Sequence, residues 1–378
     1  MRLVIPLKLL PSFEQAALLR DTLRQGNAAA NAISSLAWRE RTFGRFKLQK
    51  LVYAKTRWRF GLSAQIVVRL IAKVADAYKI DRAQHRRFRP LGSIAYDDRI
   101  LRFGSDHVSI WTTGGRQSVP FVCGARQRSM LACRQGECDL ICRSGEWYLL
   151  ATVKVIEPPI GDVDDYLGID LGIKNIAATS DGELFAGGHA NGLRRRHARL
   201  RARLQHKQTR SAKRLLRRHR QKEQRFITHI NHTISKCLVR TAQCTQRGLA
   251  LEDLEGIRSR IKARRSQRGI LHSWSFNQLR QFVAYKAVLA GVSVVYVDPR
   301  NTSRTCPACG LVDARNRPTQ ARFKCVGCGL AGLADTIAAE NIRVRGRAVC
   351  KPAVHGGIGV WDRVCHCVET PSCKSCLQ

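Results

Sequence analysis

The stretch YLGIDLGIKNIAATSDGELFAGG, residues 166–188, decides the fold of this chain. It contains two short apolar runs joined by brief connections, and Asp181-Gly182 is a dipeptide that favours a hairpin turn. Asp170 lies inside the first apolar run, where burial disfavours an isolated charge. The stretch therefore predicts paired, buried strands that carry an acid in need of a partner.

Two more acids have a similar setting. Glu252 follows the apolar run 249–251, and Asp335 lies near the start of ADTIAAENI, residues 334–342, whose apolar spacing suits a helix. Three carboxylates drawn together would repel and would raise one another's pKa unless a cation lay among them. Taken singly, each acid fits capping or ion pairing better than metal binding, and local context does not select these three. Only a fold could unite residues so far apart in sequence.

Divalent magnesium would resolve that repulsion, because it takes hard oxygen ligands and keeps waters that a phosphate can displace. Two such ions can hold the attacking water and the leaving oxygen of an in-line phosphoryl displacement. In that arrangement Asp170 would be the shared bridging ligand, and Glu252 and Asp335 would complete the two shells. We expect Mg²⁺, with Mn²⁺ as an alternative.

Four cysteines form a second candidate metal site. Cys306-Pro-Ala-Cys309 and Cys325-Val-Gly-Cys328 are two CxxC motifs separated by the 15 residues 310–324. This spacing is typical of a closed tetrahedral zinc site, and four thiolates leave no position open for a substrate. The motifs predict one structural Zn²⁺.

The charge is strongly unbalanced, since 66 Lys and Arg face 28 Asp and Glu, a net charge of +38. With 44% hydrophobic residues the chain can still form a core. Such a charge predicts a nucleic-acid partner, and binding that weakens steeply with salt.

Residues 194–225 hold 15 Lys or Arg and a single acid, Glu223, in a long helical stretch that continues into an apolar seam. A solvated helix face is the plain alternative to nucleic-acid binding. The residues expected to contact phosphates are Arg195, Arg199, Arg203, Lys207 and Arg214. A second basic run, 258–268, includes Arg258 and Arg264 and is expected to border the cleft beside Glu252.

The N-terminal part predicts helices over 12–36 and 63–80, capped by Ser12 and Ser63. Between them Lys55, Arg57 and Arg59 alternate with aromatics, which could stack on unpaired bases or be buried in a helix. Gln65 could read an adenine edge. From about 91 to 157 the period changes to two, which predicts a small antiparallel barrel or sandwich ending at Glu157-Pro158-Pro159.

The chain has 15 cysteines, no run long enough for a membrane span and no secretory segment. Reduced thiols in the cytoplasm fit best. Further metal sites at Cys123, Cys133, Cys138 and Cys142, or in the cysteine-rich end, are weaker alternatives. We expect residues 346–378 to form a loose tail.

The segments LGIDLGIKNIAATSDG, LALEDL, TSRTCPACG and ADTIAAENI resemble, in order, the motifs of the TnpB family, transposon-encoded RNA-guided DNA nucleases similar to compact type V CRISPR effectors. The resemblance covers roughly 160–345. It implies that Asp170, Glu252 and Asp335 are the catalytic acids of a RuvC-like (ribonuclease H-like) core. PSFEQAALLRDTLRQGNAAAN and GEWYLLATVKV look, more loosely, like the family's helical recognition part and wedge-like barrel.

The resemblance implies a multidomain α/β plus β-barrel protein with an inserted four-cysteine zinc ribbon. The expected parts are a wedge-like barrel (1–10 and 90–159), a helical recognition domain (11–89), a RuvC-like nuclease (160–302 and 329–345), a zinc ribbon (303–328) and the tail (346–378). The implied function is cleavage of double-stranded DNA beside a short motif, directed by a transposon-derived guide RNA. We expect a monomer associated with the nucleoid of a bacterial or archaeal host.

Three other functions stay open. A guided repressor that cannot cut is the first, although the complete acid triad counts against it. A transposase that joins strands itself is the second. The third is a structural zinc protein of ribonucleoprotein particles, which would bind RNA without metal-dependent cleavage.

Overall fold

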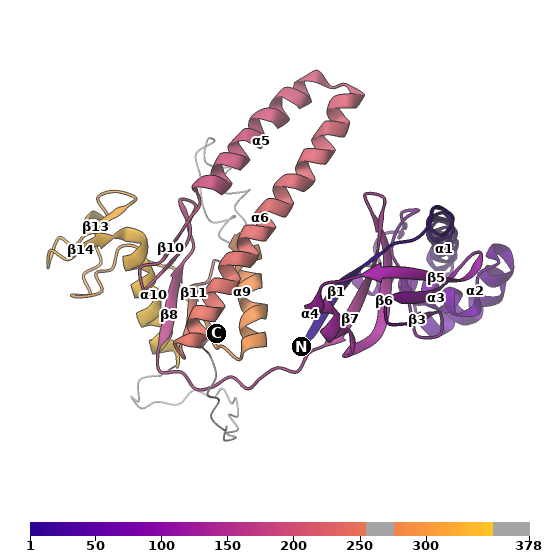
Figure 1. Ribbon diagram of the computed structural model, residues 1–378, viewed down its shortest axis with the longest axis horizontal. Coiled ribbons are helices and arrows are strands. Elements are labelled where there is room, and N and C mark those ends of the chain that lie inside the picture. The colour runs from indigo at the N-terminus through magenta and orange to yellow at the C-terminus, as the bar shows by residue number, and fades with distance from the viewer. Residues whose placement is uncertain (255–275, 351–378) are drawn as a thin grey trace. The chain divides into compact units, whose positions relative to one another are not determined.

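A computed structural model describes residues 1–254 and 276–350, and the chain forms two compact units, Met1–Glu157 and the part from Pro158 onward (Figure 1). The division falls within the Glu157-Pro158-Pro159 segment. Within the described ranges, no helix combines the length and apolar character that a membrane span requires. Each unit has its own hydrophobic core.

The first unit contains a seven-stranded antiparallel sheet in the order β2-β6-β7-β1-β5-β4-β3. The strands are β1 Arg2–Leu9, β2 Ile94–Tyr96, β3 Leu101–Phe103, β4 His107–Thr112, β5 Gly115–Val122, β6 Arg134–Arg143 and β7 Glu146–Lys154. The predicted alternation is confirmed in β7, where every second residue is buried. The strands form one sheet with β2 and β3 at its edges, so of the two predicted arrangements the near-barrel sheet is supported and the sandwich is not.

Two helices, α1 Phe13–Arg39 and α3 Ala64–Ile80, pack on this sheet, and α2 Arg45–Phe60 packs against both of them. The short helix α4 Ala125–Leu131 joins β5 to β6. The predicted capping box is confirmed, because the Ser12 hydroxyl accepts from the Gln15 N–H and the Gln15 side chain accepts from the Ser12 N–H. Ser63 likewise caps α3. The helix α2, which carries the basic and aromatic residues, was expected only as an alternative.

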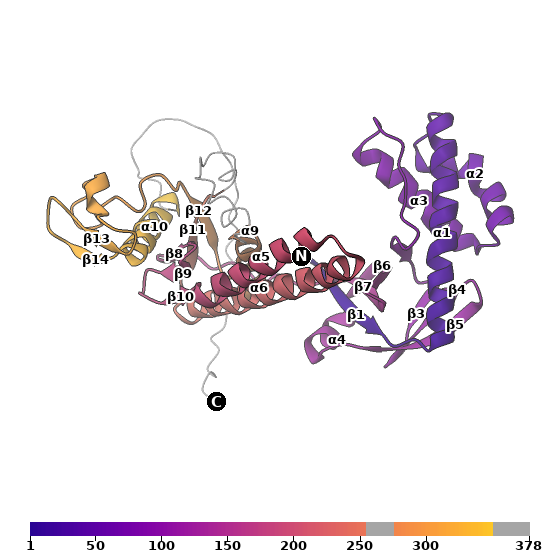
Figure 2. The ribbon, with the colours of Figure 1, turned by 90° about the horizontal axis from the view of Figure 1, so that it is seen from above.

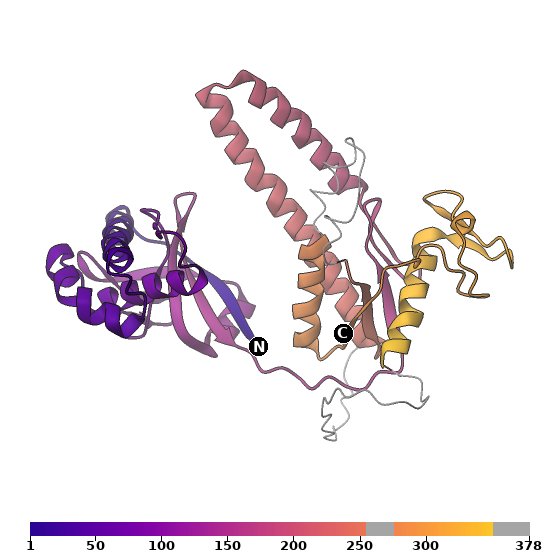
Figure 3. The same ribbon diagram turned by 180° about the vertical axis from the view of Figure 1, so that it is seen from behind.

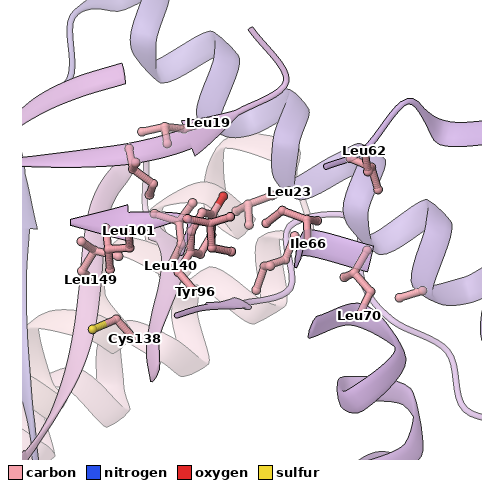
Figure 4. Packing of buried hydrophobic residues seen from close by; sticks show 14 of the residues in the cluster. Leu19, Leu23, Leu62, Ile66, Leu70, Tyr96, Leu101, Cys138, Leu140 and Leu149 are labelled. Atoms are coloured by element: carbon pink, nitrogen blue, oxygen red, sulfur yellow. The ribbon is translucent and has the colours of Figure 1, made fainter. Parts of the chain in front are cut away.

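The core of the first unit lies between the helices and the sheet. Figure 4 shows Leu23 of α1 and Ile66 of α3 beside Tyr96 and Leu140 of the sheet, all of them buried. Each such aliphatic side chain stabilises the fold by roughly 1.5–3 kcal/mol when it is fully buried. This packing fixes α1 and α3 on the sheet.

The second unit is built on a mixed sheet in the order β10-β9-β8-β11-β12. The strands are β8 Tyr166–Asp170, β9 Asn175–Thr179, β10 Leu184–Ala186, β11 Gly248–Glu252 and β12 Val294–Val297. The first three pair antiparallel through tight turns, as the 166–188 stretch predicts, whereas β8, β11 and β12 are parallel. Parallel pairing requires long crossover connections, which helices provide here.

The two faces of this sheet are covered by different helices. Leu167 and Ile169 of β8 pack with residues of α6 (Arg210–Cys244) and α9 (Phe276–Ala290). Tyr166, on the opposite face of the pleat, packs with Ile342 of α10 (Ala334–Cys350). Figures 1 and 3 show α10 on one side of the sheet and α6 and α9 on the other.

The basic stretch forms a helical hairpin rather than one long helix. The helix α5 Gly188–Lys207 ends at Gln208, whose φ of 51° is left-handed, and Thr209 caps α6 by accepting from the Ala212 N–H. Figure 2 shows α5 lying along α6. The apolar seam of α6 is confirmed, because Ile234 and Leu238 are buried against the sheet.

The last described helix, α10, runs to Cys350. The expected tail therefore begins at least five residues too early at 346, because the helix continues beyond 337–342, where the apolar spacing that indicated it ends. Residues 351–378, with their cysteines, lie outside the described part of the chain.

Candidate metal centres

The sheet brings two of the three predicted acids to neighbouring strand ends. The parallel strands β8 and β11 finish at Asp170 and Glu252. Their register pairs Ile169 with Leu251, so the two acids are the next residues in line on adjacent strands, which lie about 4.8 Å apart. Residues in register on parallel strands point to the same face of the sheet, so the two carboxylates are neighbours.

That shared face is the one covered by α10. Side chains alternate along a strand, so Asp170 points to the same side as Tyr166, which packs with Ile342 of α10. The intervening Gly168 shows how closely the helix approaches: a Cβ at this position would lie 1.9 Å from the Ala339 carbonyl oxygen. Glycine at 168 is therefore required for α10 to lie beside the acids.

The third predicted acid, Asp335, lies in the first turn of α10 and is half-buried. One carboxylate oxygen accepts a hydrogen bond from the Asn175 side-chain amide at 2.9 Å, and the other lies 3.1 Å from a guanidinium nitrogen of Arg317. No motif or spacing in the sequence indicates a role for Asn175 or Arg317. A basic residue between a zinc motif and an acid could have been suspected from position alone.

The charges of the three acids interact. Burial, together with the negative charges of Glu252 and Asp335, raises the pKa of Asp170 to about 7, while Arg317 and the Leu171 backbone N–H oppose the shift. Such coupling is what three converging carboxylates produce in the absence of a cation. The predicted trio is thus in electrostatic contact through the fold.

Glu252 is almost fully buried and firmly held. The Thr302 hydroxyl donates to its carboxylate at 2.5 Å, and the Asn341 amide in turn donates to the backbone carbonyls of Thr302 and Thr305 at 2.7 and 2.8 Å. Burial raises the pKa of Glu252, whereas the hydrogen bond from Thr302 and the positive charge of Arg345 lower it by a smaller amount. The α10 helix therefore orients two of the three acids, one directly and one through Thr302.

The donor chemistry of this group fits a hard cation. Among groups of three or more possible ligand residues in the described part of the chain, only the four cysteines have all their ligand atoms within 4.8 Å of one another. The oxygens of the three acids are therefore more widely spaced. Mg²⁺ commonly uses one or two carboxylates and keeps several waters. A spaced set of carboxylates, partly buried and mutually repelling, suits such an ion.

The four cysteines form a compact cluster. The sulfurs of Cys306 and Cys328, and those of Cys309 and Cys325, are each 3.5 Å apart. Four Zn–S bonds of about 2.3 Å imply sulfurs roughly 3.8 Å apart in a tetrahedron. Backbone N–H groups of Cys328 and Gly327 donate to the Cys325 sulfur and lower its pKa to about 6, which favours the thiolate.

The module that carries these cysteines has little other core. It contains the two-stranded sheet of β13 (Arg322–Lys324) and β14 (Ala331–Leu333), and Figure 2 shows it next to α10. Its hydrophobic cluster has only Phe323 and Ala334 besides two of the cysteines as buried members. Each CxxC motif is followed directly by a glycine with a left-handed φ, Gly310 or Gly329. The arrangement fits one structural zinc ion.

For the remaining thiols, no comparable cluster occurs among the residues that can be described, and Cys138 is a buried core residue of the first unit.

The predicted nucleic-acid residues are placed unequally. All five on the hairpin (Arg195, Arg199, Arg203, Lys207 and Arg214) are exposed. On the first unit, Lys55 and Arg59 line a groove of about 580 Å³ between α1 and α2, with Arg57 exposed beside it. Gln65 donates to Asp97 and accepts from Arg99, so reading a base would require breaking both contacts. Arg258 and Arg264 lie outside the described residues.

Two parts of the chain match known families. Residues 153–256 match the family described as "Probable transposase" (OrfB_IS605). Residues 276–342 match the "Cas12f1-like, TNB domain". The first match contains β8 and β11 with their acids, and the second contains the cysteine module and Asp335.

Curated relatives are similar over between a third and just over half of the chain. They include a CRISPR-associated endodeoxyribonuclease, Cas12f1 of Sulfoacidibacillus thermotolerans (39% identical over 126 residues, 33% of this chain and 28% of the relative). A TnpB-like protein of Methanocaldococcus jannaschii is 34% identical over 131 residues, 34% of this chain and 46% of the relative. InsQ of Escherichia coli K12, whose name describes an RNA-guided DNA endonuclease, is 28% identical over 238 residues, 56% of this chain and 58% of InsQ. The chain thus spans less than half the length of the first two.

Among solved structures, the Cas12f1-sgRNA-target DNA complex aligns with a TM-score of 0.40 at 14% identity, covering 91% of this chain and 99% of that one. CasPhi-2 bound to crRNA aligns with a TM-score of 0.43 at 14% identity, covering 66% and 62%. Scores this low do not establish a common fold.

Proposed function

We propose that this chain, which is related to the TnpB family, is an RNA-guided, Mg²⁺-dependent endonuclease of double-stranded DNA. The family resemblance inferred from the sequence is confirmed by the matched families and by the relatives named TnpB-like and Cas12f1. The observation that carries the nuclease proposal is the placement of Asp170 and Glu252 at adjacent ends of parallel strands, on the face covered by α10, which carries Asp335. Guide RNA and target DNA as partners rest on the relatives' names and on the charge of +38.

The chain's own residues have distinct proposed roles. Mg²⁺, when bound, would supply the Lewis acidity and the activated water for phosphodiester hydrolysis by a two-metal mechanism. Asp170, with a pKa near neutrality, would release its proton and bridge the two ions. Thr302 holds Glu252 as a fixed terminal ligand, and Arg317 orients Asp335. Sequence specificity would come from guide pairing.

The finer domain assignment follows from this function. The sheet order with three antiparallel strands followed by two parallel ones supports a ribonuclease H-type, RuvC-like core for 160–302 and 329–345. In this assignment, 303–328 is the zinc ribbon, 11–89 the recognition domain, and 1–10 with 90–159 the wedge-like part. The exposed basic face of α5 would follow the nucleic-acid backbone.

The alternatives make different demands on the site. A repressor that cannot cut has no need for three acids held by Thr302, Asn175 and Arg317. A strand-joining transposase agrees with the description of the first matched family, but the relatives' names describe guided endonucleases. The nuclease is therefore the function that the site supports best.

The proposal is tested by isolating the protein from its native host and sequencing the RNA that copurifies. We expect one uniform RNA from the flank of its own gene. When this RNA is reprogrammed toward a plasmid, Mg²⁺ should produce linear DNA and EDTA should prevent it. Recovery of bulk ribosomal RNA, or joining of transposon ends without cleavage of a guided target, would overturn the proposal.

Arg317 is expected to act by positioning Asp335. Removing its guanidinium in Arg317→Ala should slow cleavage by about 10- to 100-fold, because a charge-assisted contact of about 1.5–3 kcal/mol is lost. Arg317→Lys should recover part of the rate, and the Mg²⁺ concentration for half-maximal cleavage should rise in both. The neighbouring Arg315→Ala is the control, since Arg315 is exposed and pairs with Asp313. Equal rates for Arg317→Ala and Arg315→Ala would show that the contact has no role.

The basic face of α5 is expected to contribute to nucleic-acid affinity through phosphates. Replacing Arg195, Arg199 and Arg203 with Gln should reduce the slope of log affinity against log salt by about 2–2.7, at roughly 0.7–0.9 per contact. The control carries Arg24→Gln, Lys79→Gln and Arg315→Gln, three cations that already have acidic partners. If both triple variants show the same slope, α5 does not contact the backbone. Fluorescence anisotropy at four salt concentrations measures the slopes.

A further inference from the structure

The α5–α6 hairpin encloses a hollow of about 370 Å³ that the proposed cleavage chemistry does not use. His197 of α5 lines it, together with His219 and Glu223 of α6. We propose that these three side chains form a site for one transition-metal ion of the Zn²⁺ class, separate from the cysteine cluster and from the acid triad.

The placement of the three side chains carries the inference. His219 and Glu223 are four residues apart on one helix, so they lie one above the other on the same face. His197 faces them from the other helix: its Nδ1 lies 3.4 Å from the Glu223 Oε2, and its ring centroid lies 5.3 Å from that of His219. Paired helices that present histidine and glutamate inward are a common way to build a metal site.

The ring nitrogens are the second observation. The Nδ1 atoms of both His197 and His219 are buried and have no hydrogen-bond partner in the structure. A buried polar atom without a partner is unfavourable and needs an explanation. A coordinated ion would satisfy both nitrogens, and two imidazoles with one carboxylate suit Zn²⁺, Ni²⁺ or Co²⁺ better than Mg²⁺.

The charge of the hairpin gives such an ion a structural purpose. Within 194–225, Glu223 is the single acid among 15 basic residues, so α5 and α6 repel each other. Glu223 already links them, because Arg201 donates to its Oε2 at 3.2 Å. An ion held by both helices would add a stronger link and keep the exposed basic faces at a fixed spacing.

The trio must contract to bind. Its donor atoms are more widely spaced than the cysteine sulfurs, the described set whose ligand atoms all lie within 4.8 Å. A side-chain rotation of His219 toward Glu223 would close the site. The neighbouring cations oppose a further positive charge, so we expect moderate affinity rather than the permanent occupancy of a structural zinc.

The test is a titration of the protein with Co²⁺. Before the titration the cysteines are loaded with Zn²⁺, and Mg²⁺ is present in excess to occupy the acid triad. Wild type should bind one more equivalent of Co²⁺ than His197→Asn/His219→Asn, with a visible absorption that lacks thiolate-to-metal bands. Glu223→Gln, which keeps the side-chain shape, should bind that equivalent at least tenfold more weakly. His206 is an exposed histidine of α5, the helix that carries His197. The variant His206→Asn should therefore bind as much Co²⁺ as wild type.

Helix content by circular dichroism should be equal in all four proteins, which separates loss of ligands from loss of the hairpin. Equal Co²⁺ stoichiometry in wild type and the double variant would overturn the proposal. So would a wild type that takes up no Co²⁺ beyond its cysteine and Mg²⁺-protected sites. Guided cleavage is a separate readout, so failure here leaves the nuclease proposal intact.

Discussion

Asp170→Asn should abolish guided DNA cleavage, with a rate reduction of at least about 10³-fold, and should stabilise the metal-free protein at neutral pH. The first effect follows because the amide cannot serve as an anionic ligand shared by two ions. The second follows because the pKa of Asp170 is raised to about 7 by burial and by Glu252 and Asp335. Single-turnover cleavage and thermal unfolding in EDTA measure the two effects.

The sign of the pH dependence is fixed by that shift. The folded protein keeps the Asp170 proton up to a pH near 7, whereas the unfolded chain loses it near the ordinary value of about 3.9. Between these values the folded state binds more protons, so wild-type stability falls as pH rises. Asn cannot ionise, so the variant's advantage should grow across this window by up to about 1.4 kcal/mol per pH unit.

Asp181→Asn is the matched control, because it changes the same residue type in the turn between β9 and β10 of the same unit. Asp181 pairs with Arg247, and this pairing lowers its pKa. The control variant should cleave normally and should lose, rather than gain, stability above the ordinary carboxyl pKa. If Asp170→Asn cleaves at the rate of Asp181→Asn, the acid at the end of β8 is not a metal ligand.

The second large effect is expected at the cysteine cluster. Cys325→Ser should reduce the bound zinc from one equivalent to a small fraction and unfold the module, because its core has almost nothing besides the sulfurs and Phe323. Structural zinc contributes about 10–16 kcal/mol of folding free energy in small modules. Cleavage should fall by about 10- to 100-fold, as in Arg317→Ala, since Arg317 would no longer be held beside Asp335.

Cys244→Ser supplies the control, because Cys244 is exposed and belongs to no cluster. It should retain one zinc and full activity. In both variants the first unit should unfold at its wild-type temperature, because its own core contains no part of the module. A Cys325→Ser protein that keeps its zinc, or that cleaves like Cys244→Ser, would contradict the structural role of the cluster.

Much of the fold could be predicted because local chemistry and global structure agree. Ser12 and Ser63 cap helices where their sequence context indicates, and the apolar runs around Asp170 and Glu252 became adjacent strands. The two CxxC motifs identified their own site, since ligand spacing in a short loop fixes the geometry. These features depend on residues near one another in sequence.

The remaining features depend on contacts between distant residues. Asn175 and Arg317 reach Asp335 only because α10 crosses the sheet above β8, and Thr302 reaches Glu252 through a loop held by Asn341. The break at Gln208 went unpredicted because a continuous basic run has no Gly or Pro to mark a turn. Gln65 was given a base-reading role without knowledge of its neighbours Asp97 and Arg99.

In the proposed site, acids on β8, β11 and α10 jointly bind two divalent ions. Anomalous diffraction from crystals of the guide-bound protein soaked in Mn²⁺ tests it directly. We predict two Mn²⁺ peaks, both within coordination distance of an Asp170 oxygen, one also bound by Glu252 and the other by Asp335. Manganese found elsewhere, or acids that remain turned away from any peak, would contradict the account.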